Sequence, residues 1–114
     1  MKVLLVEDEA LVRMMAAETL EDAGFEVIEA ATGEEALAAC KVHTADVLFT
    51  DIRLPGNLSG WDVAEHCRAS NPDLPVIYAT GYSDSEPRQV PGSAFFRKPY
   101  RPAEIVKKIR DLTG

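Results

Sequence analysis

Acidic side chains directly follow two of the short apolar runs in this sequence. Glu7, Asp8 and Glu9 follow the first run, and Asp51 follows a later one. Two carboxylates about 4 Å apart repel by roughly 4 kcal/mol at an effective dielectric near 20, so such a cluster needs a cation to offset its charge. Oxygen ligands without a nearby His or Cys favour Mg²⁺. These acids therefore predict a magnesium site if the fold brings them together.

A hydroxyl and an amine follow two further apolar runs. Thr80 comes after VIYA and Lys98 comes shortly after AFF. A phosphoryl group needs a compensating positive charge and a hydrogen-bond donor, and these two residue types supply both. Taken singly, an Asp after a strand usually caps a helix or turn, and a Thr is usually an ordinary strand residue. Taken together, the residues indicate phosphoryl chemistry.

Short strand-like runs alternate with longer helical patterns along the whole chain. We predict strands at 3–6, 26–30, 46–50, 76–79 and 94–96. We predict helices at 10–23, after a capping signature at Thr32 and Glu35, after Ser59, and from Pro102. This alternation favours an α/β fold with a parallel sheet and helices on both faces. Ligands of such folds gather beyond the carboxyl ends of the strands, where the polar residues above are expected.

The motifs VLLVEDE, TDIRLPG, YATGY and FFRKPY, in this order, resemble the receiver domain of two-component response regulators, the CheY-like superfamily. The resemblance covers residues 1–114 as one receiver domain. It implies a doubly wound, flavodoxin-like sheet of five parallel strands in the order 2-1-3-4-5. The stretch LPVIYATGYSD also resembles the single-domain regulators named for a FAT GUY motif, with Tyr78 in place of the Phe.

The resemblance also assigns roles to particular residues. It implies that Asp51 accepts a phosphoryl group, that Lys98 pairs with the phosphate, and that Thr80 is the switch hydroxyl. It implies a Mg²⁺ ion held by Glu7, Asp8, Asp51 and the backbone carbonyl of Arg53. It places Phe95 as a rotating switch aromatic, although plain core packing is the alternative for a Phe. It further implies a cis peptide bond before Pro99.

The function implied by the resemblance is a phosphoacceptor switch in a phosphorelay rather than an enzyme. A histidine kinase or a histidine phosphotransfer protein would donate the phosphoryl group, with only weak self-catalysed phosphorylation and dephosphorylation. Without an output domain, the signal would pass by phosphate shuttling or by contact with a downstream protein. That contact would lie on the face of the fourth strand, the fifth strand and the last helix. The expected protein is a cytoplasmic monomer or a weak phosphorylation-dependent dimer.

Composition narrows the classes of partner. The 114 residues hold 19 Asp and Glu against 12 Lys and Arg, a net charge of −7. This balance argues against direct nucleic-acid binding, since phosphate backbones attract basic surfaces. The first apolar run is too short for a membrane span or a signal peptide core. Cys40 and Cys67 lack metal-ligand spacing, and we interpret them as reduced, half-buried thiols rather than as a disulfide or a metal site.

The segment 82–93 departs from the usual receiver pattern. It contains Pro87, Pro91 and Gly92 and no apolar face with helical spacing. Proline inside a helix costs roughly 3 kcal/mol, so we expect the fourth helix of typical receivers to be short or absent here. In receivers, Arg53 and Tyr82 would flank the path of water to an aspartyl phosphate. We expect both to obstruct it.

Three other functions fit parts of the sequence. A small phosphatase with an aspartyl nucleophile would want a second Asp two residues after Asp51, but Arg53 stands there. A flavin-carrying module of the same fold would want a Ser/Thr/Gly-rich loop where Glu7 to Glu9 lie. A receiver that binds partners without phosphorylation would not need all of the acids, the hydroxyl and the amine described above. All of them are present, which argues against this alternative.

Overall fold

The structure is a computed structural model that describes residues 1–81 and 88–114. Strands and helices alternate along these residues as far as β4, which β5 follows in the element order. In chain order they are β1 (Lys2–Val6), α1 (Ala10–Asp22), β2 (Glu26–Ala30), α2 (Gly33–Val42), β3 (Val47–Asp51), α3 (Gly60–Ser70), β4 (Val76–Thr80), β5 (Ala94–Arg97) and α4 (Pro102–Thr113). Within the described ranges, no helix has both the length and the apolar character that crossing a membrane requires.

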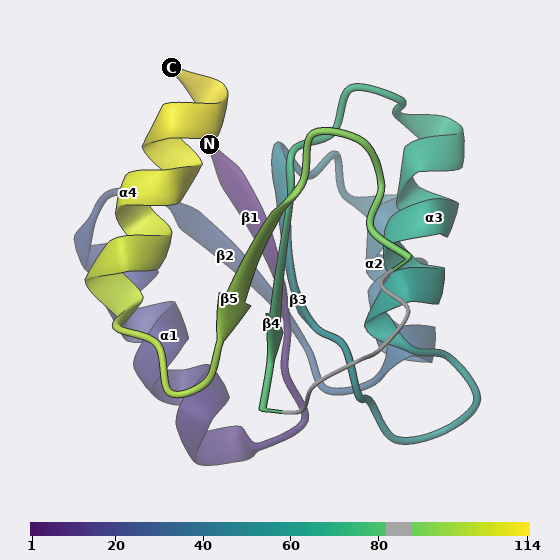
Figure 1. The fold of residues 1–114 in the computed structure, drawn as a ribbon, viewed down its shortest axis with the longest axis horizontal. Coiled ribbons are helices and arrows are strands. Elements are labelled where there is room, and N and C mark those ends of the chain that lie inside the picture. The colour runs from purple at the N-terminus through teal and green to yellow at the C-terminus, as the bar shows by residue number, and fades with distance from the viewer. Residues whose placement is uncertain (82–87) are drawn as a thin grey trace.

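The strands form one parallel sheet in the order β2-β1-β3-β4-β5. Helices α1 and α4 cover one face, and α2 and α3 cover the other (Figure 1). The predicted doubly wound, flavodoxin-like fold and its strand order are therefore confirmed. All carboxyl ends of the strands lie at one edge of the sheet, the lower edge in Figure 1.

The alternation of side chains along each strand builds two separate cores. In β1, Leu4 and Val6 point toward the α2 and α3 face, whereas Val3 and Leu5 point toward the α1 and α4 face. Each of these four residues is at most 1% exposed. A strand buried on both faces must be apolar throughout, which is why the continuous run in the sequence marks β1 correctly.

Side-chain caps start two of the helices. The Thr32 hydroxyl accepts a hydrogen bond from the Glu35 N–H (3.0 Å), and the Glu35 carboxylate accepts one from the Ala31 N–H. Ser59 and Asp62 form a complete capping box at the start of α3. These caps satisfy amide groups that a helix leaves unpaired at its first turn. They fix the helix starts at the carboxyl edge of the sheet.

Residues 88–90, ahead of β5, pack along α3 and against β4. Arg88 forms ion pairs with Asp62 and Glu65, and the Val90 N–H donates to the Tyr78 hydroxyl (3.2 Å). Gly81 and residues 88–93 form no helix, as expected for a shortened fourth helix. The rest of that prediction falls on 82–87, which lie outside the described residues.

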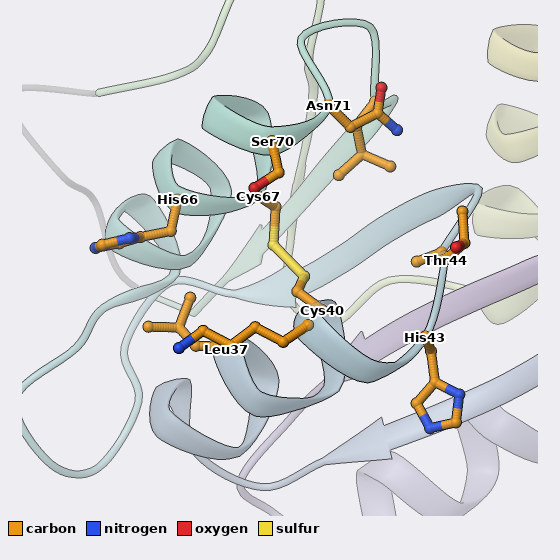
Figure 2. A pocket seen from close by; sticks show the side chains of 11 residues that line it. Leu37, Cys40, His43, Thr44, His66, Cys67, Ser70 and Asn71 are labelled. Atoms are coloured by element: carbon orange, nitrogen blue, oxygen red, sulfur yellow. A yellow bond between two sulfur atoms is a disulfide. The ribbon is translucent and has the colours of Figure 1, made fainter.

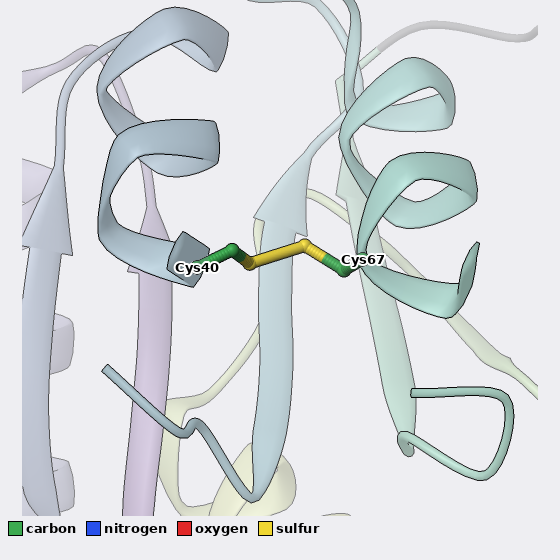
Figure 3. The surroundings of a disulfide bond; sticks show 2 residues. All are labelled: Cys40 and Cys67. Carbon is green, nitrogen blue, oxygen red and sulfur yellow. A yellow bond between two sulfur atoms is a disulfide. The ribbon is translucent and has the colours of Figure 1, made fainter. Parts of the chain in front are cut away.

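A disulfide joins Cys40 of α2 to Cys67 of α3, with the two Cα atoms 6.5 Å apart (Figure 3). The interpretation of these residues as reduced thiols is therefore wrong. The two cysteines are separated by 27 positions in the sequence. Only the packing of α2 beside α3 on one face of the sheet places their side chains within bonding range.

Candidate functional site

The carboxyl edge of the sheet brings three predicted acids together. Glu7 and Asp8 follow β1, and Asp51 is the last residue of the neighbouring strand β3. One carboxylate oxygen from each lies within 4.8 Å of the others. Glu7 and Asp51 are buried and Asp8 is exposed, so the cluster opens to solvent on one side.

Asp51 is held in a position that disfavours its charge. Burial and the neighbouring charge of Glu7 raise the pKa of Asp51 from 3.8 to about 7, although Lys98 opposes this shift. Its Oδ1 accepts a hydrogen bond from the Ile52 N–H at 3.2 Å. Positive charge brought to the cluster would therefore favour the ionised carboxylate, which is the form that can act as a nucleophile.

Lys98, the residue after β5, supplies one such charge. Its Nζ donates to Glu7 Oε1 at 2.7 Å and to Asp51 Oδ2 at 3.1 Å. Burial of Lys98 disfavours its charged form, but the hydrogen bonds and charges of Glu7 and Asp51 outweigh that effect and raise its pKa above the ordinary value. The amine is therefore a fixed cation between two buried carboxylates.

The donor set fits a hard divalent cation. Glu7, Asp8 and Asp51 offer three carboxylate oxygens in reach of one another, and the Lys98 ammonium pairs with Glu7 and Asp51. Mg²⁺ takes oxygen ligands, usually one or two carboxylates together with waters and phosphate oxygens. The acidic cluster can therefore hold such an ion and leave coordination positions for a phosphoryl group.

The remaining predicted residues lie around this cluster. Thr80 ends β4 and is buried, and its carbonyl accepts a hydrogen bond from the Lys98 N–H (2.8 Å). Arg53 is exposed on the loop after β3. The Lys98–Pro99 peptide bond is cis, the isomer that the resemblance implies. Tyr82 lies outside the described residues.

Phe95 is set apart from the carboxylates. It is half-buried on β5 and stacks on Trp61 of α3, with ring centroids 6.5 Å apart and an angle of 24° between the rings. Tyr78 contacts the same indole at 4.7 Å. Phe95 thus belongs to an aromatic cluster beneath α3 rather than to the acidic site itself.

Three further residues support the site. Arg13 of α1 donates to the Glu7 carbonyl at 2.8 Å. Burial raises the pKa of Tyr100 to about 12, and nearby Glu7 adds to the effect. At Gly60 a Cβ atom would overlap the backbone of Asp51, so α3 can start this close to β3 only with glycine. For Arg13, the sequence offered one signal of a role at the site: its place in the predicted helix 10–23, about one turn after Glu9.

Residues 3–110 match the family model of the response regulator receiver domain. The transcriptional regulatory protein PdtaR of Mycobacterium tuberculosis is 32% identical over 113 residues, which cover 95% of this chain and 54% of the relative. This chain spans about half the length of the curated relatives it matches.

Solved structures agree with the match. A response regulator receiver protein from Sinorhizobium medicae has a TM-score of 0.93 at 32% identity, with 98% of this chain and 93% of that chain covered. The response regulator protein TrrA from Thermotoga maritima, solved in complex with Mg²⁺ and BeF, has a TM-score of 0.86 at 31% identity, with 97% of each chain covered.

Proposed function

Because this chain belongs to the response regulator receiver domain family, we propose that it is a phosphoacceptor switch whose acceptor is Asp51. The observation that carries the proposal is the contact of Lys98 Nζ with both Asp51 and Glu7 at the open carboxyl edge of the sheet. A buried carboxylate, a fixed amine and a further carboxylate in one place are what phosphoryl transfer to an Asp requires. The whole of residues 1–114 is proposed to act as one receiver domain.

Glu7, Asp8, Asp51 and the backbone carbonyl of Arg53 are the proposed ligands of Mg²⁺. When bound, this ion would offset negative charge on the phosphoryl oxygens. The chain itself contributes position and charge. Lys98 would pair with a phosphoryl oxygen. The Ile52 N–H holds Oδ1 of Asp51, and Oδ2 accepts a hydrogen bond from Lys98.

The proposed donor is the phosphohistidine of a histidine kinase or of a histidine phosphotransfer protein. A carboxylate oxygen of Asp51 forms a bond to phosphorus while the phosphorus–nitrogen bond of the donor breaks. The imidazole keeps the electron pair of that bond and takes up a proton. The product is an aspartyl phosphate, which adds negative charge and strong acceptor oxygens to the site.

Thr80 and Phe95 are the proposed switch. The Thr80 hydroxyl would bind the new phosphate, and Phe95 would move into the space that Thr80 vacates. Two features support this assignment: Thr80 is buried next to the site, and Phe95 lies in register with Tyr78 on the neighbouring strand. A downstream protein would read the change on the face of β4, β5 and α4.

The setting of this switch is part of the proposal. We infer a cytoplasmic protein that binds neither nucleic acid nor membrane directly, and that is a monomer or a weak phosphorylation-dependent dimer. It would signal through protein contact or phosphate shuttling. It would also show only weak self-catalysed phosphorylation and dephosphorylation. The net charge of −7 supports the exclusion of nucleic acid.

The test is mass spectrometry after incubation with acetyl phosphate and Mg²⁺. The wild-type chain is expected to gain one phosphate, and the gain should vanish in Asp51→Ala and in the presence of a chelator. Asp73→Ala is the matched control, because Asp73 is an exposed acid in the turn before β4, at the opposite edge of the sheet. Its mass gain should equal that of wild type.

Two results would contradict the proposal. One is a phosphate that survives in Asp51→Ala. The other is multiple turnover of a chromogenic phosphate ester, which would favour the aspartyl phosphatase instead. The exposed Arg53, where that enzyme would need a second Asp, argues against it.

A further inference from the structure

A cavity of about 430 Å³ lies between α2 and α3, at the amino edge of β3 and β4 (Figure 2). This edge is opposite the acidic cluster, so the cavity is separate from the proposed phosphoacceptor site. Its wall carries the Cys40–Cys67 disulfide together with polar groups that can form hydrogen bonds, including Thr44, Ser70 and Asn71. Both cysteines line the cavity, so a small molecule bound there would lie beside the disulfide.

The charge of this cavity differs from that of the whole chain. Among the described residues, no Asp or Glu lines it, although the sequence has seven more acids than Lys and Arg together. Its titratable side chains besides the cysteines are Lys41, His43 and His66. In Figure 2 the two imidazole rings lie on either side of the disulfide. A lining that carries the Lys41 ammonium and no carboxylate favours an anionic ligand.

The two halves of the disulfide are not equally accessible. Cys67 is 4% exposed and packs into the core beneath α3, whereas Cys40 is half-buried near the end of α2. A thiol entering from solvent therefore reaches Cys40 more readily. Access decides which sulfur of a disulfide is attacked.

We propose that this cavity binds an anionic low-molecular-weight thiol of the glutathione class, and that the thiol exchanges with the Cys40–Cys67 disulfide. The thiolate attacks Cys40 Sγ, the bond between the two cysteines breaks, and Cys67 leaves as a thiolate that takes up a proton. A second thiolate then attacks the sulfur of the bound thiol. Cys40 is released as a thiol, and the reagent leaves as its own disulfide.

The reverse sequence re-forms the bond with the oxidised form of the same reagent. The Cys40 thiolate attacks the reagent's disulfide and releases one thiol. Cys67 then attacks Cys40 Sγ and releases the second. Helices α2 and α3 are thus joined covalently in one state and held only by packing in the other. This inference does not depend on the chemistry of Asp51.

The test compares two thiols on the oxidised chain of residues 1–114, at equal thiolate concentration. Reduced glutathione is anionic, and 2-mercaptoethanol is neutral. Free cysteines are trapped with an alkylating reagent and counted by mass spectrometry. Lys41→Gln is expected to slow reduction by glutathione roughly two- to fivefold, since one exposed charge contributes little. Reduction by 2-mercaptoethanol should stay unchanged, and oxidised glutathione should restore the disulfide.

The point of attack is tested in single-cysteine variants. In folded Cys67→Ser, oxidised glutathione is expected to form a mixed disulfide on Cys40. In folded Cys40→Ser, the adduct on Cys67 should form at least tenfold more slowly, and the difference should disappear in urea. Circular dichroism checks that both variants fold. The Lys41→Gln comparison needs neither of them.

Three outcomes would overturn the inference. The first is a pair of thiols that stays free in oxidised glutathione. The second is an equal effect of Lys41→Gln on both reagents. The third is faster adduct formation on Cys67 than on Cys40 in the folded chain.

Discussion

Asp51 is a carboxylate whose surroundings oppose its ionisation until a cation arrives. Burial and Glu7 raise its pKa to about 7, and Lys98 alone does not cancel that effect. Such a residue is costly to keep charged, because a buried charge needs compensation. A divalent cation would lower this free-energy cost of ionised Asp51. A phosphoryl group bound later would again change the net charge at this edge of the sheet.

The first prediction concerns how far ionised Asp51 lowers the free energy of unfolding. Without divalent cations, the pKa is higher in the folded state than in the unfolded state, so the folded state binds more protons between about pH 4 and 7. The free energy of unfolding should therefore fall as pH rises through this window. The Asp51→Asn variant should not show this decrease in the free energy of unfolding. At pH 8 it should be roughly 2 to 4 kcal/mol more stable than wild type.

Urea unfolding at pH 4, 6 and 8 in the presence of chelator measures this effect. Adding Mg²⁺ at pH 8 should raise the stability of wild type more than that of Asp51→Asn. Asp73→Asn serves as the control for loss of an exposed acid, and it should follow wild type at every pH. Parallel pH curves for wild type and Asp51→Asn would contradict the prediction.

The second prediction concerns Arg53, two residues after Asp51. We expect its long exposed side chain to obstruct water approaching an aspartyl phosphate, whereas Asn is shorter and can hold water by a hydrogen bond. Arg53→Asn should therefore speed dephosphorylation by several-fold. The measurement is the loss of the phosphate mass after acetyl phosphate is removed. Arg110→Asn, near the end of α4, should decay as wild type does, and an unchanged rate in Arg53→Asn would count against the idea.

At the scale of elements, α1 places an apolar surface beside the acidic cluster. The helix begins at Ala10, immediately after the acids of β1. Leu11, Met14 and Met15 are 72%, 56% and 64% exposed and lie on one side of the helix, as their spacing requires. Met15 also lines a hollow of about 390 Å³ that reaches Lys98. This continuity favours docking of a protein that must deliver a phosphoryl group to Asp51.

The third prediction follows from this surface. The double variant Leu11→Gln, Met14→Gln should slow phosphoryl transfer from a phosphorylated histidine phosphotransfer protein by about tenfold, the scale of a lost interface contact. Transfer from acetyl phosphate should not change, because that donor needs no docking surface. The donor protein is chosen for its ability to phosphorylate the wild-type chain, and labelled phosphate follows the transfer.

Val42→Gln is the control for this experiment. Val42 is 78% exposed, like the residues of α1, but it ends α2 at the opposite edge of the sheet. Its transfer rates from both donors should equal those of wild type. Equal losses with the protein donor and with acetyl phosphate would place the effect of the α1 substitutions in the site rather than in docking.

The elements themselves were largely predictable from sequence. Each strand lies within one residue of its predicted range. For β1, β3 and β4 the reason is burial on both faces, which leaves continuous apolar runs. The acids and Lys98 were found for the same reason, since they directly follow such runs. The disulfide was missed because Cys40 and Cys67 meet only through the packing of α2 on α3. Arg88 and its ion pairs were missed for the same reason, because they depend on Arg88 lying beside α3, far from it in sequence.

At the scale of the whole molecule, the aromatic cluster links the sheet to the face that partners are proposed to read. Trp61 is the single tryptophan of the sequence and is buried against Tyr78 and Phe95. It belongs to α3, whose first residue lies against the backbone of Asp51. Rearrangement of Phe95 on β5 would therefore change the surroundings of one indole, and that indole can be observed without a label.

The fourth prediction uses this arrangement to test the switch. Phosphorylation by acetyl phosphate and Mg²⁺ should shift the emission maximum of Trp61, because rotation of Phe95 removes a stacked ring 6.5 Å away and alters access of water. Asp51→Asn should show no shift. Thr80→Ala should still gain the phosphate mass yet lose most of the shift, since the hydroxyl that couples phosphate to Phe95 is gone. A full shift in phosphorylated Thr80→Ala would leave Phe95 as a packing residue and would require another route from Asp51 to the partner face.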